Sequence, residues 1–599
     1  MKTTAVRTTK RKTQIPEARP QSFMRLVLVW VFLVVVAIAL IIRFSYLQIA
    51  TSQDLQRKAA LQQDRTLTPF LPRRPIIDRH GAFLAIDKPI YDLRAHPYLY
   101  KQFAPKDIAA QLAPILSEDP QKLESLLALD ATTVTIKKWL SESIANQVRN
   151  ISIEGIRVDG LELEEKNQRF YPQQNLAAEV IGYVNGEQKG QVGVELTQEK
   201  HLLLQTDKTI DVRQDGRGRL IPADVPEKII RSDRSKLQLT IDENLQRIAR
   251  QALQATIQKY HAKRGTVMVM DVNNGELPVL VTEPNFDPNQ FYNYSKTPDV
   301  LRNWAVSDLY EPGSTFKPLN VAIALQVGAI QPDQVFYDEG SLTIGGWQVA
   351  NFNYETNGGG GALTISQILQ RSSNVGMVHI IQQMRPAVYY KWLQAIGLGD
   401  KSGIDLYPEE ASTLKSKDIF LEQVIEPATA AFGQGLSLTP IQMLQLQGIL
   451  ASGGKRLTPH VVRGLVDENG KLQTIDNFKP PTQIFTPAVT KQVVDMMTSV
   501  VQEGTGKPAR IPGYRLGGKT GTAQKSVNGT YVRAKITSFV GIFPAEQPKY
   551  VILAVVDEPV GADAFGSTVA APVVKSVIEG LIVADNILPT HPEELIKAK

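Results

Sequence analysis

Cysteine is missing from all 599 residues, and histidine occurs only seven times. Without thiols the chain has no disulfide, no thiolate metal site and no cysteine nucleophile. The histidines show none of the spacings typical of zinc enzymes, such as HExxH, so the sequence predicts neither a metal nor a cofactor. An apolar fraction of 43% is ordinary for folded proteins, and the length allows more than one domain.

An excess of charge is missing from most of the chain as well. Residues 1–25 hold seven lysines or arginines and one acid, Glu17, which accounts for the whole net charge of +6. The rest of the sequence is balanced. Because nucleic-acid binding needs a basic face on a folded domain, this distribution argues against a nucleic-acid partner.

One long apolar run follows this basic segment. Leu26 to Ile42 is a run of 17 apolar residues between Arg25 and Arg43. About 17 residues is the lower limit for a membrane span, whereas the apolar part of a cleaved signal has about 7 to 15. We therefore expect an uncleaved anchor over 26–43, rather than a cleaved signal or a buried core helix. The positive-inside rule then places 1–25 in the cytoplasm and the bulk outside the plasma (inner) membrane.

Residues 44–235 form a mixed region without a reactive cluster, which we interpret as a non-catalytic domain, called the pedestal below, with a linker over 220–236. Two of its segments stand out. One is RRPIIDRHG, beginning at Arg73, and the other spans 169–196 with the runs RFYP and GQVGVEL. The neighbouring charges Asp78 and Arg79 in the first are predicted to pin one segment to another, rather than to take part in chemistry.

Residues 236–585 show the pattern of a second, larger domain. A helix is predicted from near Asp242, and two β-rich runs then meet at an Asn273–Gly275 turn, which predicts a hairpin. Helix and loop sequence fills 304–501. It includes a glycine run, 358–361, that is typical of a flexible loop.

Strand character returns after that insert. GGKTGTAQK and RAKITSFVGIFP flank an Asn528–Gly529 turn, YVILAVVDEP follows, and a last helix is predicted over 569–583 before a short tail, 586–599. Two strands before the insert and three after it predict a five-stranded, mostly antiparallel sheet flanked by helices. The chain as a whole is predicted to be α+β, with one N-terminal transmembrane helix and a mixed pedestal domain.

The segment YEPGSTFKPL places a serine and a lysine one helical turn apart. Pro312 and Gly313 should end any preceding element, so Ser314 falls near the start of a helix. Lys317 then shares its face and can point at the hydroxyl, while the unpaired N–H groups of the first turn can face an oxyanion. The SxxK spacing alone is weak evidence for a nucleophile, because such a pair usually marks only a solvated helix start. A second SxxK match begins at Ser412.

Two further signals follow in a fixed order. Ser372 to Asn374 lie in QRSSNVG, and Lys519 to Thr522 lie in GGKTGT, whereas no SxN separates Ser412 from KTG. This triple resembles the penicillin-recognising serine enzymes, the D,D-transpeptidases and serine β-lactamases, in which the three elements line one cleft.

The resemblance implies a division of labour at the reacting bond. Ser314 would attack a carbonyl, and Lys317 would take the serine proton if burial and nearby cations lower the lysine pKa. Ser372 would relay a proton to the leaving amine. Asn374 would hold Lys317 and the substrate amide in place.

The KTGT segment would bind the substrate. Lys519 adds positive charge, and the Thr520 and Thr522 hydroxyls, with Gly521 between them, can bind a substrate carboxylate. On an edge strand this segment would also let an extended peptide add as a further strand. By resemblance, the N–H groups of Ser314 and Thr522 form the oxyanion hole.

A competing motif overlaps this one. Gly513 to Thr520, GYRLGGKT, matches the phosphate-binding pattern GxxxxGK[ST]. That pattern requires a strand before the loop and a helix after it, so that helix N–H groups hold phosphate. Here the following sequence predicts a hairpin, which argues against a nucleotide site.

The resemblance extends over most of the chain. From Arg73 to Glu579 the sequence is similar to the class B penicillin-binding proteins. The sequences YEPGSTFKP and MMTSVVQEGTG resemble the septal, FtsI-type member more than the elongation type. Arg74 and His80 depart from the Gly and Asn usual in the pedestal, which puts only its local turn geometry in doubt.

The resemblance implies a peptidoglycan D,D-transpeptidase that cross-links stem peptides ending in D-Ala-D-Ala during septal cell-wall synthesis. It would bind penicillin covalently through a serine acyl-enzyme. Glycan polymerisation would come from an FtsW-type glycosyltransferase among other divisome membrane proteins. An elongation-type transpeptidase, a serine β-lactamase and a catalytically silent division scaffold are the alternatives.

Overall fold

The structure is a computed structural model. It describes residues 20–597 apart from 51–52, 55–56, 59–63, 68–72, 101, 204–209, 214–233, 476–477 and 528–529. Most of the predicted basic tail, most of the predicted linker and the Asn528–Gly529 turn lie outside the described residues. Two compact units are present, 1–71 with 205–232 and 72–204 with 233–599, and each is described by itself.

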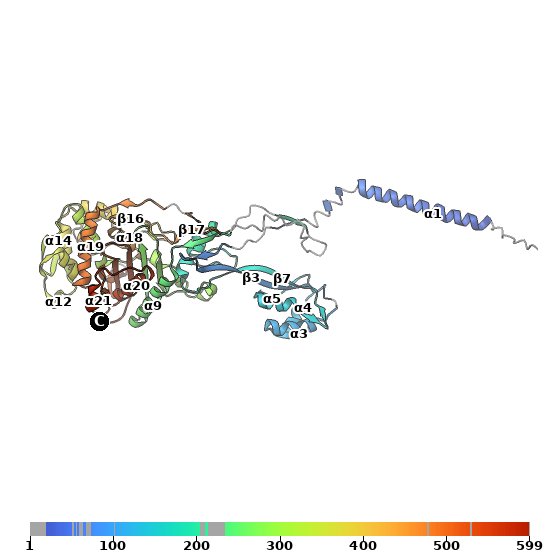
Figure 1. The fold of residues 1–599 in the computed structure, drawn as a ribbon, viewed down its shortest axis with the longest axis horizontal. Helices are drawn as coiled ribbons and strands as arrows, with labels where there is room; N and C mark the ends of the chain where they lie inside the picture. The colour runs from blue at the N-terminus through green and yellow to red at the C-terminus, as the bar shows by residue number, and fades with distance from the viewer. Residues whose placement is uncertain are drawn as a thin grey trace, which may run out of the picture. The chain divides into compact units, whose positions relative to one another are not determined.

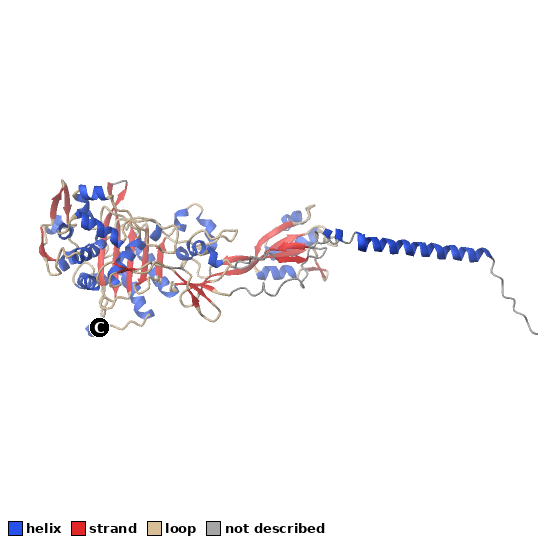
Figure 2. Cartoon of the chain, turned by 90° about the horizontal axis from the view of Figure 1, so that it is seen from above, coloured by secondary structure: helices blue, strands red, loops and turns tan. Residues whose placement is uncertain are grey.

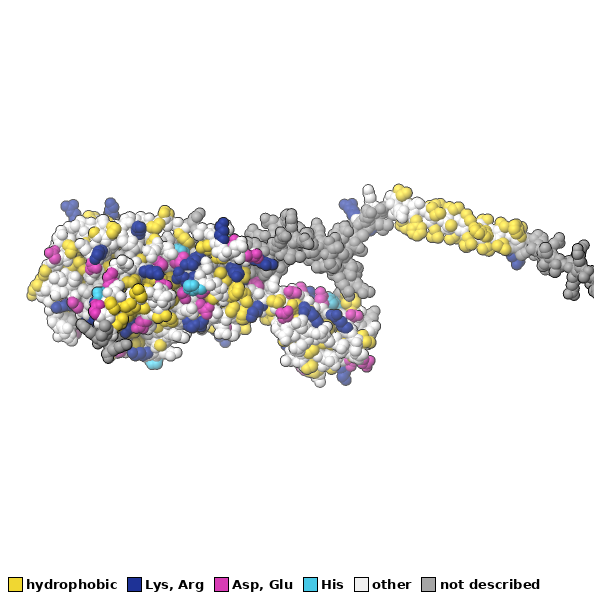
Figure 3. All heavy atoms as spheres, viewed as in Figure 1, with side chains coloured by type: hydrophobic (Ala, Val, Ile, Leu, Met, Phe, Trp, Pro, Cys, Tyr) yellow, Lys and Arg dark blue, Asp and Glu magenta, His cyan; other side chains and the backbone are white. Residues whose placement is uncertain are grey.

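The first unit contains the apolar helix. Helix α1 (Pro20–Ser45) continues into a π-helical turn, η1 (Tyr46–Ala50). The segment from Phe23 to Ala50 has a mean hydropathy of 3.0 over its best window, and none of that window is buried. Figure 3 shows apolar side chains covering this helix. The predicted anchor lies wholly within a helix long enough to cross a bilayer. Strands β1 (Asp64–Leu67) and β8 (Ile210–Arg213) pair antiparallel in the same unit.

The second unit is built on a five-stranded sheet. Its strands, in spatial order, are β11 (Val279–Glu283), β10 (Arg264–Asp271), β22 (Tyr550–Asp557), β21 (Thr530–Phe543) and β20 (Gly517–Val527). Every neighbouring pair is antiparallel. The predicted hairpin is formed by β10 and β11, and Gly275 adopts a φ of 87° in its turn. The predicted α+β fold with this sheet is confirmed, and β20 lies at its edge.

Alternation along β10 separates two apolar cores. Val267 and Val269 belong to one core, with α9 (Glu243–Tyr260) and α20 (Ala570–Ala584) on that face of the sheet. Met268 and Met270 point to the opposite core, which α18 fills. Helix α18 (Pro440–Ala451) is buried at every position, and the side-chain amides of its three glutamines, Gln442, Gln445 and Gln447, donate to backbone carbonyls. Figure 2 shows the strands flanked by helices on both sides.

The insert between β11 and β20 contains more strand than the sequence predicts. Its helices are α10 (Trp304–Ser307), α11 (Lys317–Gln326), α12 (Tyr354–Asn357), α13 (Ile365–Arg371), α14 (Asn374–Gln382), α15 (Pro386–Ile396), α16 (Lys417–Glu422), α17 (Ile425–Ala430), α18 and α19 (Pro487–Gln502). Its short strands are β12 (Val335–Asp338), β13 (Ser341–Ile344), β14 (Trp347–Ala350), β15 (Gly361–Thr364), β16 (Lys455–Arg456), β17 (Val462–Val466), β18 (Leu472–Gln473) and β19 (Thr482–Gln483). The 3₁₀ turns of this unit are η4 (Pro288–Tyr294), η5 (Pro298–Leu301), η6 (Gly313–Phe316) and η7 (Lys507–Ala509). These strands are two to five residues long, and apart from a second pairing of β17 they pair with one another, so their periodicity is too short to read.

The pedestal shares a sheet with the larger domain. Its strands are β2 (Ile76–Ile77), β3 (Phe83–Ala95), β4 (Val134–Leu140), β5 (Ser152–Ile153), β6 (Ile156–Arg157) and β7 (Leu161–Phe170), and its helices are α3 (Pro105–Leu116), α4 (Pro120–Leu127), α5 (Glu142–Arg149), α6 (Ala178–Ile181), α7 (Gly193–Thr197) and α8 (Glu199–Leu202). Strand β9 (Lys236–Leu239) lies at the start of the larger domain. Strand β9 pairs parallel with β2 and antiparallel with β17, which belongs to the insert. The pedestal is therefore hydrogen-bonded to the domain that carries the predicted reactive residues (Figure 1).

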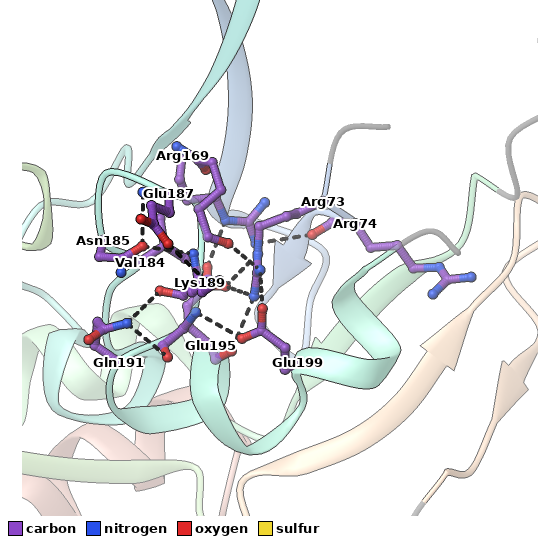
Figure 4. Close-up of polar contacts among 12 residues, drawn as sticks. Arg73, Arg74, Arg169, Val184, Asn185, Glu187, Lys189, Gln191, Glu195 and Glu199 are labelled. Carbon is purple, nitrogen blue, oxygen red and sulfur yellow. Dashed lines mark hydrogen bonds and ion pairs between the residues drawn. The ribbon is translucent and has the colours of Figure 1, made fainter. Parts of the chain in front are cut away.

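Two buried arginines of the pedestal share one buried glutamate (Figure 4). Arg73 Nη2 lies 2.8 Å from Glu195 Oε2 and Arg169 Nε lies 2.7 Å from Glu195 Oε1, and these side chains are at most 1% exposed. Arg73 also pairs with Glu199, and Arg169 with Asp87. The RRPIIDRHG, RFYP and GQVGVEL runs thus meet at one ionic cluster.

The charges predicted to pin one segment to another do so. The Asp78 carboxylate accepts the backbone N–H of His80 at 2.8 Å and that of Glu243, at the start of α9, at 3.3 Å. Arg79 lies 3.5 Å from Glu276. His80, one of the two unusual residues of this segment, is accommodated in the turn.

Removal of the shared carboxylate should destabilise the second unit. In a Glu195→Ala variant two buried guanidinium groups lose a partner, and breaking a buried ion pair costs about 3 to 5 kcal/mol. We expect a lower thermal unfolding midpoint for the full-length protein in detergent. Glu187→Ala removes the exposed partner of Lys189 in the same region, and its midpoint should match the wild type. Equal midpoints for both variants would contradict this role.

Candidate active site

Ser314 lies in a tight turn at the entrance to a buried helix. It is part of η6, so the sequence placed it correctly before a helix, but the first turn is 3₁₀ and α11 begins only at Lys317. Gly313 adopts a φ of 55°, and a Cβ on it would lie 3.2 Å from the Cβ of Ala523 on β20. Glycine therefore lets the serine turn approach the KTGT strand closely. Ser314 itself is half-buried.

Lys317 is fully buried and reaches the SSN segment. Its Nζ donates to the Ser372 carbonyl at 2.6 Å, to Asn374 Oδ1 at 2.8 Å and to Ser372 Oγ at 3.3 Å. Asn320, on the same helix as Lys317, donates to the carbonyls of Ala430 and Ala431, and these bonds hold α11 against the end of α17. The lysine therefore points toward the second predicted element rather than into solvent.

The SSN segment is a junction between two helices. Helix α13 ends at Arg371, and its C-cap residue, Ser372, adopts a left-handed conformation with φ of 57°. Ser373 is the N-cap of α14, and its Oγ accepts the Gly376 N–H at 2.8 Å. A non-glycine residue with positive φ costs about 1 kcal/mol or more and is concentrated at functional sites. The junction brings Ser372 and Asn374 to the same lysine.

Lys519 approaches the same serine from the sheet. It lies on β20 with its side chain fully buried, and its Nζ donates to Ser372 Oγ at 3.0 Å and to the Thr520 carbonyl at 2.9 Å. The Ser372 hydroxyl oxygen therefore accepts from two lysines, Lys317 and Lys519. Five of the residues predicted from sequence are joined by these contacts: Lys317, Ser372, Asn374, Lys519 and Thr520.

The remaining predicted residues lie next along β20. Gly521 has no room for a side chain, since a Cβ would lie 2.4 Å from Ser538 Oγ and 3.2 Å from the Pro312 carbonyl. Thr522 Oγ1 accepts the Gly566 N–H at 3.0 Å. The predicted substrate-binding run thus borders the serine turn along the sheet edge.

Burial lowers the pKa of both lysines and so favours their uncharged forms. It lowers the pKa of Lys317 well below its ordinary value, and the charge of Lys519 lowers it further, whereas the Asp338 carboxylate opposes the shift. Burial also lowers the pKa of Lys519, to about 7. An uncharged lysine has a lone pair, so the lowered pKa makes Lys317 better able to accept a proton.

Neither competing motif has the surroundings that its pattern requires. Ser412 Oγ donates to the Asp400 carbonyl at 3.2 Å and accepts the Gly399 N–H at 2.9 Å, and Lys415 pairs with Glu426. The GYRLGGKT run leads into strand β20 and not into a helix. It therefore lacks the helix N-terminus that a phosphate-binding loop of that type requires.

Comparison with known families agrees with this geometry. Residues 265–579 match the family described as penicillin binding protein transpeptidase domain, and residues 71–228 match the penicillin-binding protein dimerisation domain. The chain belongs to the penicillin-binding protein transpeptidases. Within that family it is similar to the peptidoglycan D,D-transpeptidase FtsI homolog of Mesostigma viride, with 42% identity over 95% of this chain and 97% of the relative.

More distant relatives share the same organisation. The peptidoglycan D,D-transpeptidase FtsI of Escherichia coli K12 is 29% identical over 91% of this chain and 89% of its own length. A crystal structure of a peptidoglycan synthetase from Bifidobacterium adolescentis superposes with a TM-score of 0.67 at 24% identity, over 88% of this chain and 97% of that chain, which shows a shared fold. The protein is a class B penicillin-binding protein of FtsI type, as its sequence motifs predict.

Sequence reasoning missed residues that support the penicillin-binding motifs. Thr505 Oγ1 lies 2.9 Å from Thr520 Oγ1, and the Gly433 carbonyl accepts the Gly313 N–H at 3.0 Å. The runs EGTG and FGQG contain these residues and are visible in the sequence. Their contacts with the site depend on the fold, so spacing could not assign them.

The rate of penicillin acylation should follow a bell-shaped pH profile. Its rising limb reports loss of a proton from Lys317 and lies well below pH 10.5, because the folded protein lowers this pKa. Its falling limb reports loss of the Lys519 charge and begins near pH 7. In Lys519→Arg the falling limb should move to higher pH, since guanidinium keeps its proton. Stopped-flow acylation rates test this, and a falling limb that stays in place would contradict it.

Proposed function

We propose that this penicillin-binding protein cross-links peptidoglycan stem peptides at the division septum, with Ser314 as the nucleophile. The observation that carries the proposal is the double contact at Ser372, where Lys317 and Lys519 both donate to one hydroxyl oxygen. Similarity to FtsI-type relatives along almost the full chain supports the septal assignment.

In the acylation step the Ser314 oxygen attacks the carbonyl carbon of the penultimate D-Ala. Its proton passes to uncharged Lys317, and a C–O bond forms. The C–N bond to the terminal D-Ala then breaks, and its nitrogen takes the Ser372 hydroxyl proton, which Lys317 replaces with the proton that it took from Ser314. Because the Ser372 oxygen accepts from both lysines, its own O–H remains available to donate. The N–H groups of Ser314 and Thr522 stabilise the oxyanion.

In the second step an amine from a neighbouring stem peptide attacks the ester carbon. A C–N bond forms, the C–O bond to Ser314 breaks, and the proton that the attacking amine loses returns to the Ser314 oxygen. Lys519, Thr520 and Thr522 bind the substrate carboxylate, and the edge position of β20 gives the peptide a strand to pair with. Penicillins acylate the same serine.

The membrane topology supports an extracytoplasmic substrate. Residues 1–25 are strongly basic and precede the apolar helix, so the positive-inside rule places them in the cytoplasm and the transpeptidase domain outside the plasma membrane. Glycan strands then come from a separate membrane polymerase of FtsW type, within the divisome.

Labelling with a fluorescent penicillin tests the nucleophile. Wild-type protein in detergent should carry one covalent label, and Ser314→Ala should carry none, because the ester oxygen is lost. Ser412→Ala is a matched control from the second SxxK and should label at the wild-type level.

Two results would contradict the proposal. Retention of label in Ser314→Ala would place the acylated residue elsewhere. Normal septation in a strain whose only copy is Ser314→Ala would show that cross-linking at the septum does not depend on this serine.

A further inference from the structure

A buried aspartate lies behind the SSN junction, outside the three family motifs. Asp338 ends strand β12 and is 2% exposed. Its Oδ1 accepts the Gly340 N–H at 2.8 Å, and both carboxylate oxygens accept from the Asn351 Nδ2 group, at 2.9 and 3.0 Å. The carboxylate therefore fixes which way the Asn351 amide faces.

With its nitrogen turned to Asp338, the Asn351 side chain presents its oxygen to the start of α14. Oδ1 accepts the backbone N–H of Asn374 at 2.8 Å and that of Val375 at 3.2 Å, as well as the Ser373 hydroxyl at 3.3 Å. These donors belong to Asn374, whose side-chain amide accepts from Lys317, and to its two neighbours in the chain. Three donors on one oxygen leave the junction little freedom to shift.

The glycine run encloses this aspartate. A Cβ on Gly359 would lie 2.7 Å from the Asp338 carbonyl oxygen, and one on Gly360 would lie 3.0 Å from Asp338 Oδ2. The sequence predicted a flexible loop here. Residues 358–360 form a loop, whose glycines let the backbone pack against the carboxylate, and Gly361 belongs to β15. Replacement of water by backbone strengthens the electrostatic effect of the buried charge.

Two charged groups act on Lys317 from different elements, with opposite signs. Lys519 on β20 repels its ammonium form, and Asp338 on β12 favours it. The neighbouring pair of Glu339 and His379, 2.9 Å apart, is at least one-quarter exposed on each side chain and contacts neither Asn351 nor Asn374 in any bond that the described structure contains. Asp338 is thus the carboxylate that favours the ammonium form of Lys317.

We propose that Asp338, acting through Asn351, is a positioning residue for the transpeptidase reaction: it holds the SSN junction in place around Lys317 and supplies the negative charge that opposes Lys519. This inference rests on the proposed role of Lys317 as the base. It assigns no contact with substrate to Asp338. Its effect passes through hydrogen bonds to Asn374 and through the field at the lysine.

Asp338→Asn tests the charge, because it keeps the size and an oxygen acceptor for Asn351. The rising limb of the acylation pH profile should move to lower pH by about one unit, since loss of a nearby negative charge disfavours the ammonium form of Lys317. Glu339→Gln removes the same charge from the next residue, and its limb should stay at the wild-type position. A purely structural role would lower the rate without moving the limb.

Asn351→Ala tests the hydrogen-bond connection independently. Loss of the shared acceptor should lower the plateau acylation rate at least about tenfold while the full-length protein still unfolds cooperatively in detergent. The proposal would be overturned if the rising limb of Asp338→Asn coincided with that of the wild type. It would also be overturned if Glu339→Gln shifted its rising limb by as much as Asp338→Asn does. If Asp338→Asn does not fold, an unchanged rate in Asn351→Ala would overturn it alone.

These results separate the inference from the proposed function. If Ser314→Ala still labels, the proposed nucleophile is wrong whatever Asp338 does. If Ser314→Ala loses the label but the Asp338 and Asn351 variants behave as wild type, the transpeptidase assignment stands and only the positioning role is wrong.

Discussion

Two buried lysine side chains meet at one serine hydroxyl, and the rest of the site depends on how that crowding is resolved. Lys317 and Lys519 both donate to Ser372 Oγ, at 3.3 and 3.0 Å, and both are fully buried. Two ammonium groups at such a distance from a common atom repel each other and lose hydration. The arrangement therefore favours an uncharged lysine, which is the form that can activate an alcohol.

Two different elements of the fold, helix α11 and strand β20, hold the two lysines in place. Lys317 begins α11, which is buried almost throughout in the core on one face of the sheet, and Lys519 belongs to the edge strand of that sheet. Rigid elements hold a catalytic geometry better than loops do. The SSN junction, with Ser372 in a left-handed conformation, closes the space between them. Each motif is thus fixed by a different part of the core.

Much of this could be predicted from sequence because the signals are local. The hairpin of β10 and β11, the helix after Asp242 and the final helix have clear periodicity and turn residues, and the order of the SxxK, SxN and KTG motifs is specific. The contacts of Asp338, Asn351 and Thr505 could not be predicted. They join residues whose proximity is created by the fold, and each lies in a short strand or turn without a readable pattern.

In the pedestal too, the sequence revealed the charged segments but not the contacts between them. Its charged runs were visible, and a structural role was predicted for them. The sharing of Glu195 by Arg73 and Arg169, however, depends on packing of segments that lie 122 and 26 positions from the glutamate. The sheet that joins β9 to both β2 and β17 likewise connects pedestal and transpeptidase domain without a sequence signal.

The most direct test of the central claim is to map the penicillin adduct by mass spectrometry of peptides from acylated full-length protein. The account predicts one adduct, on the peptide that contains Ser314, formed by the wild type and abolished when Lys317 is replaced by methionine. An adduct on any other residue, or one that forms at the wild-type rate without Lys317, would contradict it.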